Sequence, residues 1–314
     1  DSKLDLRPIE ELESEGAGPE TLAALDLLRE KSAALQPSSV IPPFKSPARP
    51  TIDEQKEYFR KIDINAMHYI ASLPDFICTE LVHRYQMIPA RPPGSTLRRG
   101  QSLSPVGAGF WQSKDTLTVK LTYFGNQEKY QLILVNGRKT KEDYESSGGA
   151  ISEGDFGSTL LEIFRTDSGT KFQWDHWTHL RKRLTRVYSF RTSREKSHAR
   201  IGVGENPKER RTVIVGRHGF IYADDETAMV MRIVAEADSI PLGFPITSQS
   251  TMLDFDYANV GEKRFLLPLR VDNRLKTSMI YFKNVVQFTD YRKFTGESTI
   301  SFEGPDIPDT PEKK

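Results

Sequence analysis

The feature that most constrains this chain is a long succession of short strand-like segments in its second half. The stretch 116–124 alternates, with Leu117, Val119 and Leu121 on one face, and Asn136-Gly137 is a strong tight-turn signal. Further strand candidates are 130–135, 170–178, 184–192, 211–222, 229–237, 251–258, 264–275, 278–290 and 297–303. Few helices interrupt them, so the pattern predicts an α+β protein whose antiparallel sheet curls, with helices against one face. The pattern is not that of an alternating parallel α/β fold, and it therefore argues against a dinucleotide fold.

The first 50 residues have a different sequence pattern. Residues 1–35 predict a short helical hairpin that carries nine acids and four bases. A hairpin of this size cannot bury a core of its own, so it is expected to dock on the main body or on a partner. Residues 36–50 contain five prolines and are typical of a linker.

The main domain is predicted to span residues 51–303. Thr51, with Glu54 three residues later, can form a capping box for a helix that continues to about Ser72. A strand is expected over 76–85, a long loop over 89–108 and one interior helix over 155–164. Residues 304–314 hold three prolines without an apolar pattern and are typical of a disordered tail.

Composition narrows the class of protein. A net charge of +1 argues against a general nucleic-acid-coating protein, and 37% hydrophobic residues suffice for a core. The single cysteine, Cys78, excludes an intrachain disulfide and a Cys-cluster zinc site. No stretch approaches the roughly 18 apolar residues of a membrane-spanning helix.

The sequence offers no convincing catalytic signature. The turn 149–154 has the spacing of half a phosphate loop, but Asp155 stands where phosphate binding requires lysine. His176 and His179 would share a face only on a helix, and the aromatic residues around them favour a strand. Ser193-Arg-Glu-Lys196 matches a short pattern that random chains often carry. We therefore predict a protein that is not an enzyme, with no cofactor, no catalytic residue and no metal site, and keep a metal-dependent enzyme using these histidines as the remotest alternative.

One segment has an unusual charge. Residues 179–217 hold twelve bases and three acids. A sheet edge blunted by basic residues explains this pattern, and so does a surface for an anionic partner such as lipid head groups or the chain's own acidic hairpin. The candidates for an anionic-partner patch are Arg181, Lys182, Arg183, Arg186, Arg191 and Arg194. Aromatic residues interleave sparsely here, so no nucleic-acid partner is predicted.

Aromatic residues are frequent, with 17 Phe, 11 Tyr and 3 Trp. On a curled sheet they could line an apolar cavity or simply fill the core, and the sequence favours neither. The candidate cavity-lining residues are Leu117, Val119, Leu121, Ile133, Leu160, Phe164 and Met231.

The region 51–303 resembles a group of exported bacterial proteins of uncharacterised function. The resemblance is carried by Leu73-Pro-Asp-Phe-Ile-Cys78, Leu121-Thr-Tyr-Phe-Gly125, Gly148-Gly149 with Phe156-Gly157, Trp174-Asp-His-Trp177, Phe265-Leu-Leu-Pro-Leu-Arg270 and Asp290-Tyr-Arg-Lys-Phe294. More distantly, the segment from Gly219 to Arg232 is similar to the central hairpin of the lipoprotein-carrier superfamily, which includes the periplasmic lipoprotein carrier and its outer-membrane receptor. That resemblance implies a strongly curved half-barrel with helices against its concave side, and an acyl-chain site.

These observations lead to two expectations. The first is a non-enzymatic exported or periplasmic protein that binds a lipid, a lipoprotein or another amphipathic ligand in the half-barrel. The alternative is a protein-interaction or envelope-sensor module with a filled core, in which the acidic hairpin and the basic segment are the working surfaces.

Overall fold

The computed structural model describes residues 3–14, 19–36, 46–87, 111–125, 127–144, 147, 157–203 and 210–294. The expected loop at 89–108, the turn at 149–154, the strand at 297–303 and the tail at 304–314 lie outside these ranges, as do 37–45 of the linker. The lone residue described between 145 and 156 is Ser147.

Four helices are present in the described parts of the chain: α1 (Leu6–Ser14), α2 (Pro19–Lys31), α3 (Ile52–Ser72) and α4 (Ser158–Phe164). The strands are β1 (Phe76–Met87), β2 (Gln112–Phe124), β3 (Gln127–Val135), β4 (Arg138–Lys139), β5 (Lys171–Leu180), β6 (Arg183–Thr192), β7 (Arg200–Val203), β8 (Arg211–Ile214), β9 (Gly216–Asp224), β10 (Val230–Asp238), β11 (Ile246–Val260), β12 (Lys263–Thr277) and β13 (Tyr281–Lys293). Within the described ranges, no helix combines the length and the apolar character needed to cross a membrane.

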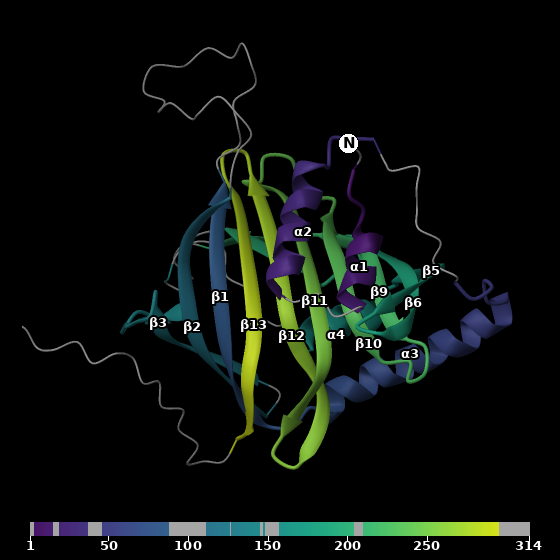
Figure 1. Ribbon diagram of the computed structural model, residues 1–314. Coiled ribbons are helices and arrows are strands. Elements are labelled where there is room, and N and C mark those ends of the chain that lie inside the picture. The colour runs from purple at the N-terminus through teal and green to yellow at the C-terminus, as the bar shows by residue number, and fades with distance from the viewer. Residues whose placement is uncertain are drawn as a thin grey trace, which may run out of the picture.

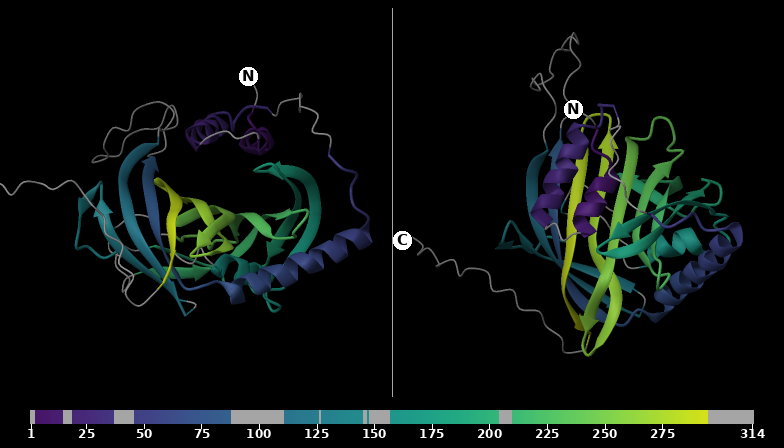
Figure 2. Two further views of the ribbon diagram at one scale, coloured as in Figure 1. Left: turned by 60° about the horizontal axis from the view of Figure 1, so that its bottom comes forward. Right: turned by 45° about the vertical axis from the view of Figure 1, so that its right-hand side comes forward.

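Eleven strands form one antiparallel sheet in the order β4-β3-β2-β1-β13-β12-β11-β10-β9-β6-β5 (Figure 1). Most neighbours follow one another along the chain, but the last strand, β13, pairs with β1. The end strands β4 and β5 are not bonded to each other, so the sheet stays open. Figure 2 (left) shows that it rises at both edges, at β1 and β2 on one side and at β5 and β6 on the other. The predicted α+β fold with a curved antiparallel sheet is confirmed.

The two faces of the sheet have opposite character. Ile221, Ile233, Leu253, Val271 and Val286 pair in succession across β9, β10, β11, β12 and β13, and each is at most 2% exposed. The residues next to these on each strand form a second row across the same strands, namely Tyr222, Arg232, Asp254, Arg270 and Gln287. Because successive side chains of a strand point to opposite faces, one face of the sheet is apolar and the other carries charges.

Helix α3 covers the apolar face. Its predicted capping box is present, with the backbone N–H of Glu54 donating to Thr51 Oγ1 and that of Thr51 donating to the Glu54 carboxylate. Tyr58, Ile62 and Ala66 recur at helical spacing and enter the main apolar cluster of the sheet. Met67 of the same helix, although apolar, is 40% exposed.

The predicted N-terminal helices are present and dock on the main body. Figure 1 shows both helices in front of the sheet, with α2 beside β12 and α1 nearer to β10. Glu10 of α1 contacts Arg232, which belongs to the charged row, so the pair covers the face opposite to α3. The sheet therefore carries helices on both faces, as Figure 2 (left) shows.

The predicted strand 211–222 is wrong in one respect. The chain changes sheets at the buried Val215, so that β8 pairs with β7 and β9 pairs with β6 and β10. The sequence analysis also missed β7 and the two-residue β4. A continuous run of strand-forming residues does not show where a chain exchanges one partner strand for another.

Two isoleucines of α3 provide a test of how the apolar face is sealed. Ile62 is 0% exposed, whereas Ile64 is 58% exposed. We expect Ile62→Ala to lower the free energy of unfolding by about 2–5 kcal/mol, because it leaves a cavity under the helix. The control, Ile64→Ala, should change it by less than about 0.5 kcal/mol in urea denaturation. Equal effects would contradict the assigned helix face.

Candidate functional site

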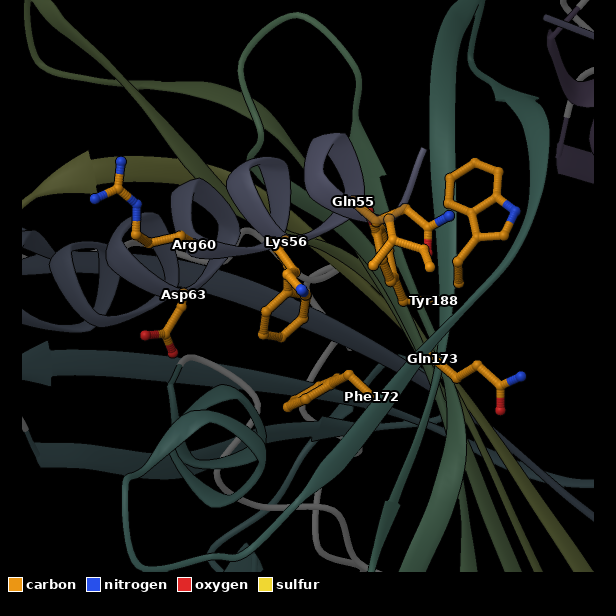
Figure 3. A pocket seen from close by; sticks show the side chains of 10 residues that line it. Gln55, Lys56, Arg60, Asp63, Phe172, Gln173 and Tyr188 are labelled. Atoms are coloured by element: carbon orange, nitrogen blue, oxygen red, sulfur yellow. The ribbon is translucent and has the colours of Figure 1, made fainter. Parts of the chain in front are cut away.

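A groove opens between α3 and the edge strand β5 with its neighbour β6. Its volume is about 570 Å³, which suits a small-molecule ligand. The strands contribute Phe172, Gln173, Trp174 and Tyr188, and α3 contributes Ile52, Gln55, Lys56, Phe59, Arg60 and Asp63. Figure 3 shows Phe172 on the strand side facing α3, with Lys56, Arg60 and Asp63 along the helix.

The inner wall of the groove is aromatic. The ring centroids of Phe59 and Phe172 are 4.4 Å apart, and those of Phe59 and Tyr188 are 5.6 Å apart. Trp174 meets Tyr188 edge-on at 5.5 Å. These contacts join the wall to the main apolar cluster, so it stays rigid without any ligand.

The outer rim of the groove is charged. Lys56 and Arg60 lie one helical turn apart on α3 and both are exposed. Asp63 follows on the same edge of the groove, and Lys56 also lies 3.7 Å from Asp53. An aromatic wall below two cations suits a molecule with an apolar body and an anionic head.

Arg186 fixes the position of α3 against the strands. Its guanidinium lies 3.9 Å from the ring centroid of Tyr58 and 4.8 Å from that of Trp177. Its Nε donates to Asp225 Oδ1 over 2.6 Å. Tyr58 in turn donates its hydroxyl to the backbone carbonyl of Asp224, and burial raises the pKa of this tyrosine. The helix and the groove are thus held by cation–π contacts that the sequence did not reveal.

The predicted cavity-lining residues occupy a different place from the groove. Leu117, Val119, Leu121, Leu160, Phe164 and Met231 all belong to the main buried cluster. Ile133 is partly buried on β3. Only Phe164 lies near the groove, with its ring centroid 5.4 Å from that of Phe172. The groove residues were missed because they come from two elements more than 100 positions apart, and only the aromatic run at 172–177 hinted at them.

The predicted anionic-partner patch makes contacts within the chain. Arg183 pairs with Asp224, Arg186 with Asp225 and Arg191 with Asp238, and Arg194 donates to the carbonyl of Ile214. Arg181 and Lys182 form the tight β5–β6 turn with φ angles of 49° and 65°. Residues other than glycine adopt this left-handed conformation uncommonly. Here the turn brings the Arg181 guanidinium to 3.4 Å from Asp254.

A second concentration of charge lies on the polar face, under α1 and α2. Arg232 donates to both oxygens of Asp254, over 2.5 and 2.9 Å. Burial alone would raise the pKa of Asp254, but the charge and hydrogen bonds of Arg232, with Arg181 and Arg270 nearby, hold it below its ordinary value. Glu10 of α1 completes the cluster, 3.8 Å from Arg232 and accepting a hydrogen bond from Thr178 over 3.1 Å.

The described residues contain no cluster of three or more side chains able to hold a metal ion. His176 and His179 lie on β5, where positions three apart face opposite ways. His176 Nδ1 lies 2.5 Å from Asp175. The Cys78 thiol is buried in the main apolar cluster, and that burial raises its pKa.

Comparison with known proteins gives distant structural likenesses only. No protein-family model matches the chain, and no curated protein matches its sequence. A DUF1329 family protein from Desulfovibrio piger matches with 8% identity and a TM-score of 0.32, over 78% of this chain and 94% of that one. A candidate outer membrane lipoprotein-sorting protein domain from Vibrio parahaemolyticus matches with 10% identity and a TM-score of 0.32, over 76% and 93%.

A LolA superfamily protein from Nitrosomonas europaea matches with 9% identity and a TM-score of 0.25, over 76% of this chain and 93% of that one. The distant resemblance to the lipoprotein-carrier superfamily predicted from the sequence is therefore confirmed as a likeness. At these TM-scores it supplies neither a ligand nor a function.

Glu10 should make stability depend on pH. Burial raises its pKa above the ordinary value of 4.5, against the lowering effects of Arg232 and Thr178. Its contribution to stability is therefore complete below pH 4.5 and is lost as the pH rises through its higher folded-state pKa. We expect Glu10→Gln to gain stability relative to the wild type as the pH is raised from 4 to 8.

Urea denaturation at several pH values measures this effect. Glu57→Gln removes an exposed carboxylate of α3 and is the control for the loss of one carboxylate. A difference in stability from the wild type that does not change with pH for Glu10→Gln would show that Glu10 is not held in a buried site.

Proposed function

We propose that this chain is a ligand-binding protein that holds an amphipathic molecule with an anionic head in the groove between α3 and β5–β6. The main support for this proposal is the groove itself, whose aromatic wall lies next to a rim that carries the cations Lys56 and Arg60. Burying an alkyl chain against such a wall contributes about 0.8 kcal/mol per methylene group. The two cations would pair with a carboxylate or phosphate at the mouth.

The proposal is narrower than the sequence expectation and places the ligand elsewhere. It keeps the lipid-like ligand, the non-enzymatic role and the location in the cell envelope, the last resting on the sequence resemblance to exported proteins. It moves the site from the buried cluster around Leu121 to the groove beside Phe172. A lipoprotein would satisfy the same chemistry through its acyl chains.

Truncating the aromatic wall should weaken binding. We expect Phe172→Ala to raise the dissociation constant for dodecanoate at least tenfold, because the alkyl chain loses its main contact surface. Titration calorimetry measures this change, with circular dichroism to confirm that the variant is folded. Phe124 of β2 is 56% exposed and lies outside the groove, so Phe124→Ala is the matched control. If both variants bound dodecanoate with the affinity of the wild type, the groove would not be the binding site.

The rim cations should recognise the head of the ligand and not its tail. We expect Lys56→Gln with Arg60→Gln to weaken dodecanoate binding about tenfold and to leave dodecanol binding unchanged. The control is Lys61→Gln, which removes an exposed lysine that pairs with Glu57. If the double variant weakens both ligands equally, the cations act on the shape of the groove and the proposed head-group role is wrong.

A further inference from the structure

The α1–α2 hairpin meets the polar face of the sheet mainly through charges. Asp26 of α2 lies 3.8 Å from Arg270. Glu30, one turn later, contacts Arg274 and lies 3.8 Å from Lys283. With Glu10 beside Arg232, three hairpin carboxyl groups each face cations of β10, β12 or β13.

Among the hairpin side chains that the structure describes, few large apolar groups are buried in this contact. Leu12, Leu27 and Leu28 of the hairpin are 41%, 40% and 53% exposed. Ile9 is buried, but it belongs to neither apolar cluster of the chain. Three hairpin acids, Glu10, Asp26 and Glu30, thus face the sheet while three leucines are exposed to solvent, the reverse of the usual arrangement of a surface helix.

The charge contacts themselves are imperfect. Several are ion pairs at 3.8 Å, beyond hydrogen-bond distance. Glu10 Oε1 and Arg270 Nε are buried without a hydrogen-bond partner among the residues that the structure describes. Glu30 is paired more closely, because it contacts Arg274 and accepts a hydrogen bond from Trp111 Nε1. Desolvation of these buried charges offsets much of their attraction, which limits how strongly they hold the hairpin.

The surface under the hairpin would remain ordered without it. We call this the cationic surface, formed by Arg181, Arg232, Arg270, Arg274 and Lys283. Asp254 pairs with Arg232 and Asp272 pairs with Arg274, both within the sheet. These two buried carboxylates orient the cations, and Asp256 lies 3.5 Å from Arg181. Cations still outnumber carboxylates in this group, and the three hairpin carboxyl groups face that excess positive charge.

The hairpin is also a unit that closes on itself. The backbone N–H of Lys3 donates to the carbonyl of Gln36 over 2.7 Å, and that of Leu4 donates to Ser32 Oγ over 2.9 Å. On the far side of the linker, Trp177 Nε1 donates to the carbonyl of Ala48 and holds the chain on β5. The hairpin can therefore leave the sheet without undoing its own contacts or those of the main domain.

We propose that the α1–α2 hairpin is a displaceable cover, and that the cationic surface binds an acidic helical segment of a partner protein in its place. The hairpin itself shows the chemistry that fits, namely two carboxylates at helical spacing with a third from an adjoining helix. A tethered cover has a high effective concentration, so the partner must compete with it. This inference concerns the face opposite to the groove and goes beyond the proposed ligand-binding function.

The test uses the full chain and a fluorescent synthetic peptide with the sequence of residues 1–36. We expect Asp26→Lys with Glu30→Lys to release the cover and to bind the peptide at least tenfold more tightly than the wild type. Fluorescence anisotropy measures this gain, which should shrink as salt is added. The control is Asp5→Lys with Glu57→Lys, which changes the net charge by the same amount. Both acids are exposed, and among the described ion pairs they contact only Lys3 and Lys61. This variant should bind the peptide as the wild type does.

Peptide variants separate a specific surface from general attraction. A scrambled peptide of the same composition, and one with Glu10, Asp26 and Glu30 changed to their amides, should bind at least tenfold more weakly. Equal binding of the scrambled peptide, or no gain for Asp26→Lys with Glu30→Lys, overturns the proposal. The proposal would also be overturned if the wild-type chain formed a stable dimer and the peptide dissociated that dimer. In that case the cationic surface would bind the hairpin of a second copy of the chain.

Hydrogen exchange of the wild-type chain provides a measurement that needs no variant. Raising the salt concentration should speed exchange in α2 at least tenfold and leave β11 and β12 protected, because a charge-held cover opens while the sheet stays folded. Exchange in α2 that is as slow as in β12 at every salt concentration would show that the hairpin is a fixed part of the fold, and would overturn the proposal.

Discussion

The structure depends on one constraint, which is that neighbouring residues of a strand face opposite sides of the sheet. On β10, Ile233 enters the apolar row and Arg232 enters the charged row. The same separation continues from strand to strand because the antiparallel register keeps the rows aligned. Each face then requires a different cover. Helix α3 buries apolar side chains on one face, and the acidic hairpin neutralises charge on the other.

The two covers give the molecule two kinds of surface. At the β5–β6 edge, α3 and the strands leave a groove whose aromatic wall continues the core. Arg186 keeps α3 at this position by stacking against Tyr58 and Trp177. On the opposite face, the contacts described for α2 are made by Asp26 and Glu30 with cations of the sheet. A ligand site formed by rigid packing and a cover held by charge therefore lie on opposite faces of one sheet.

Local sequence patterns predicted much of the fold. The capping box at Thr51, the helices of the hairpin, most strands and the Asn136-Gly137 turn all depend on interactions within a few residues. Local patterns do not show which apolar residues of α3 are buried, because the sheet that the helix meets selects its buried face, and Met67 is left 40% exposed. The change of sheet at Val215 was missed for a similar reason, since partner strands are distant in sequence.

By itself, the sequence determined that this is an antiparallel, curved sheet protein with an acidic N-terminal hairpin, because alternation, turn residues and charge are local properties of the chain. Only the tertiary structure decided where the groove lies and what the hairpin covers. Phe59 meets Phe172, and Glu30 meets Arg274, across more than 100 residues of intervening chain. Such encounters follow from strand order and register, which depend on the packing of the whole sheet and which no local pattern encodes.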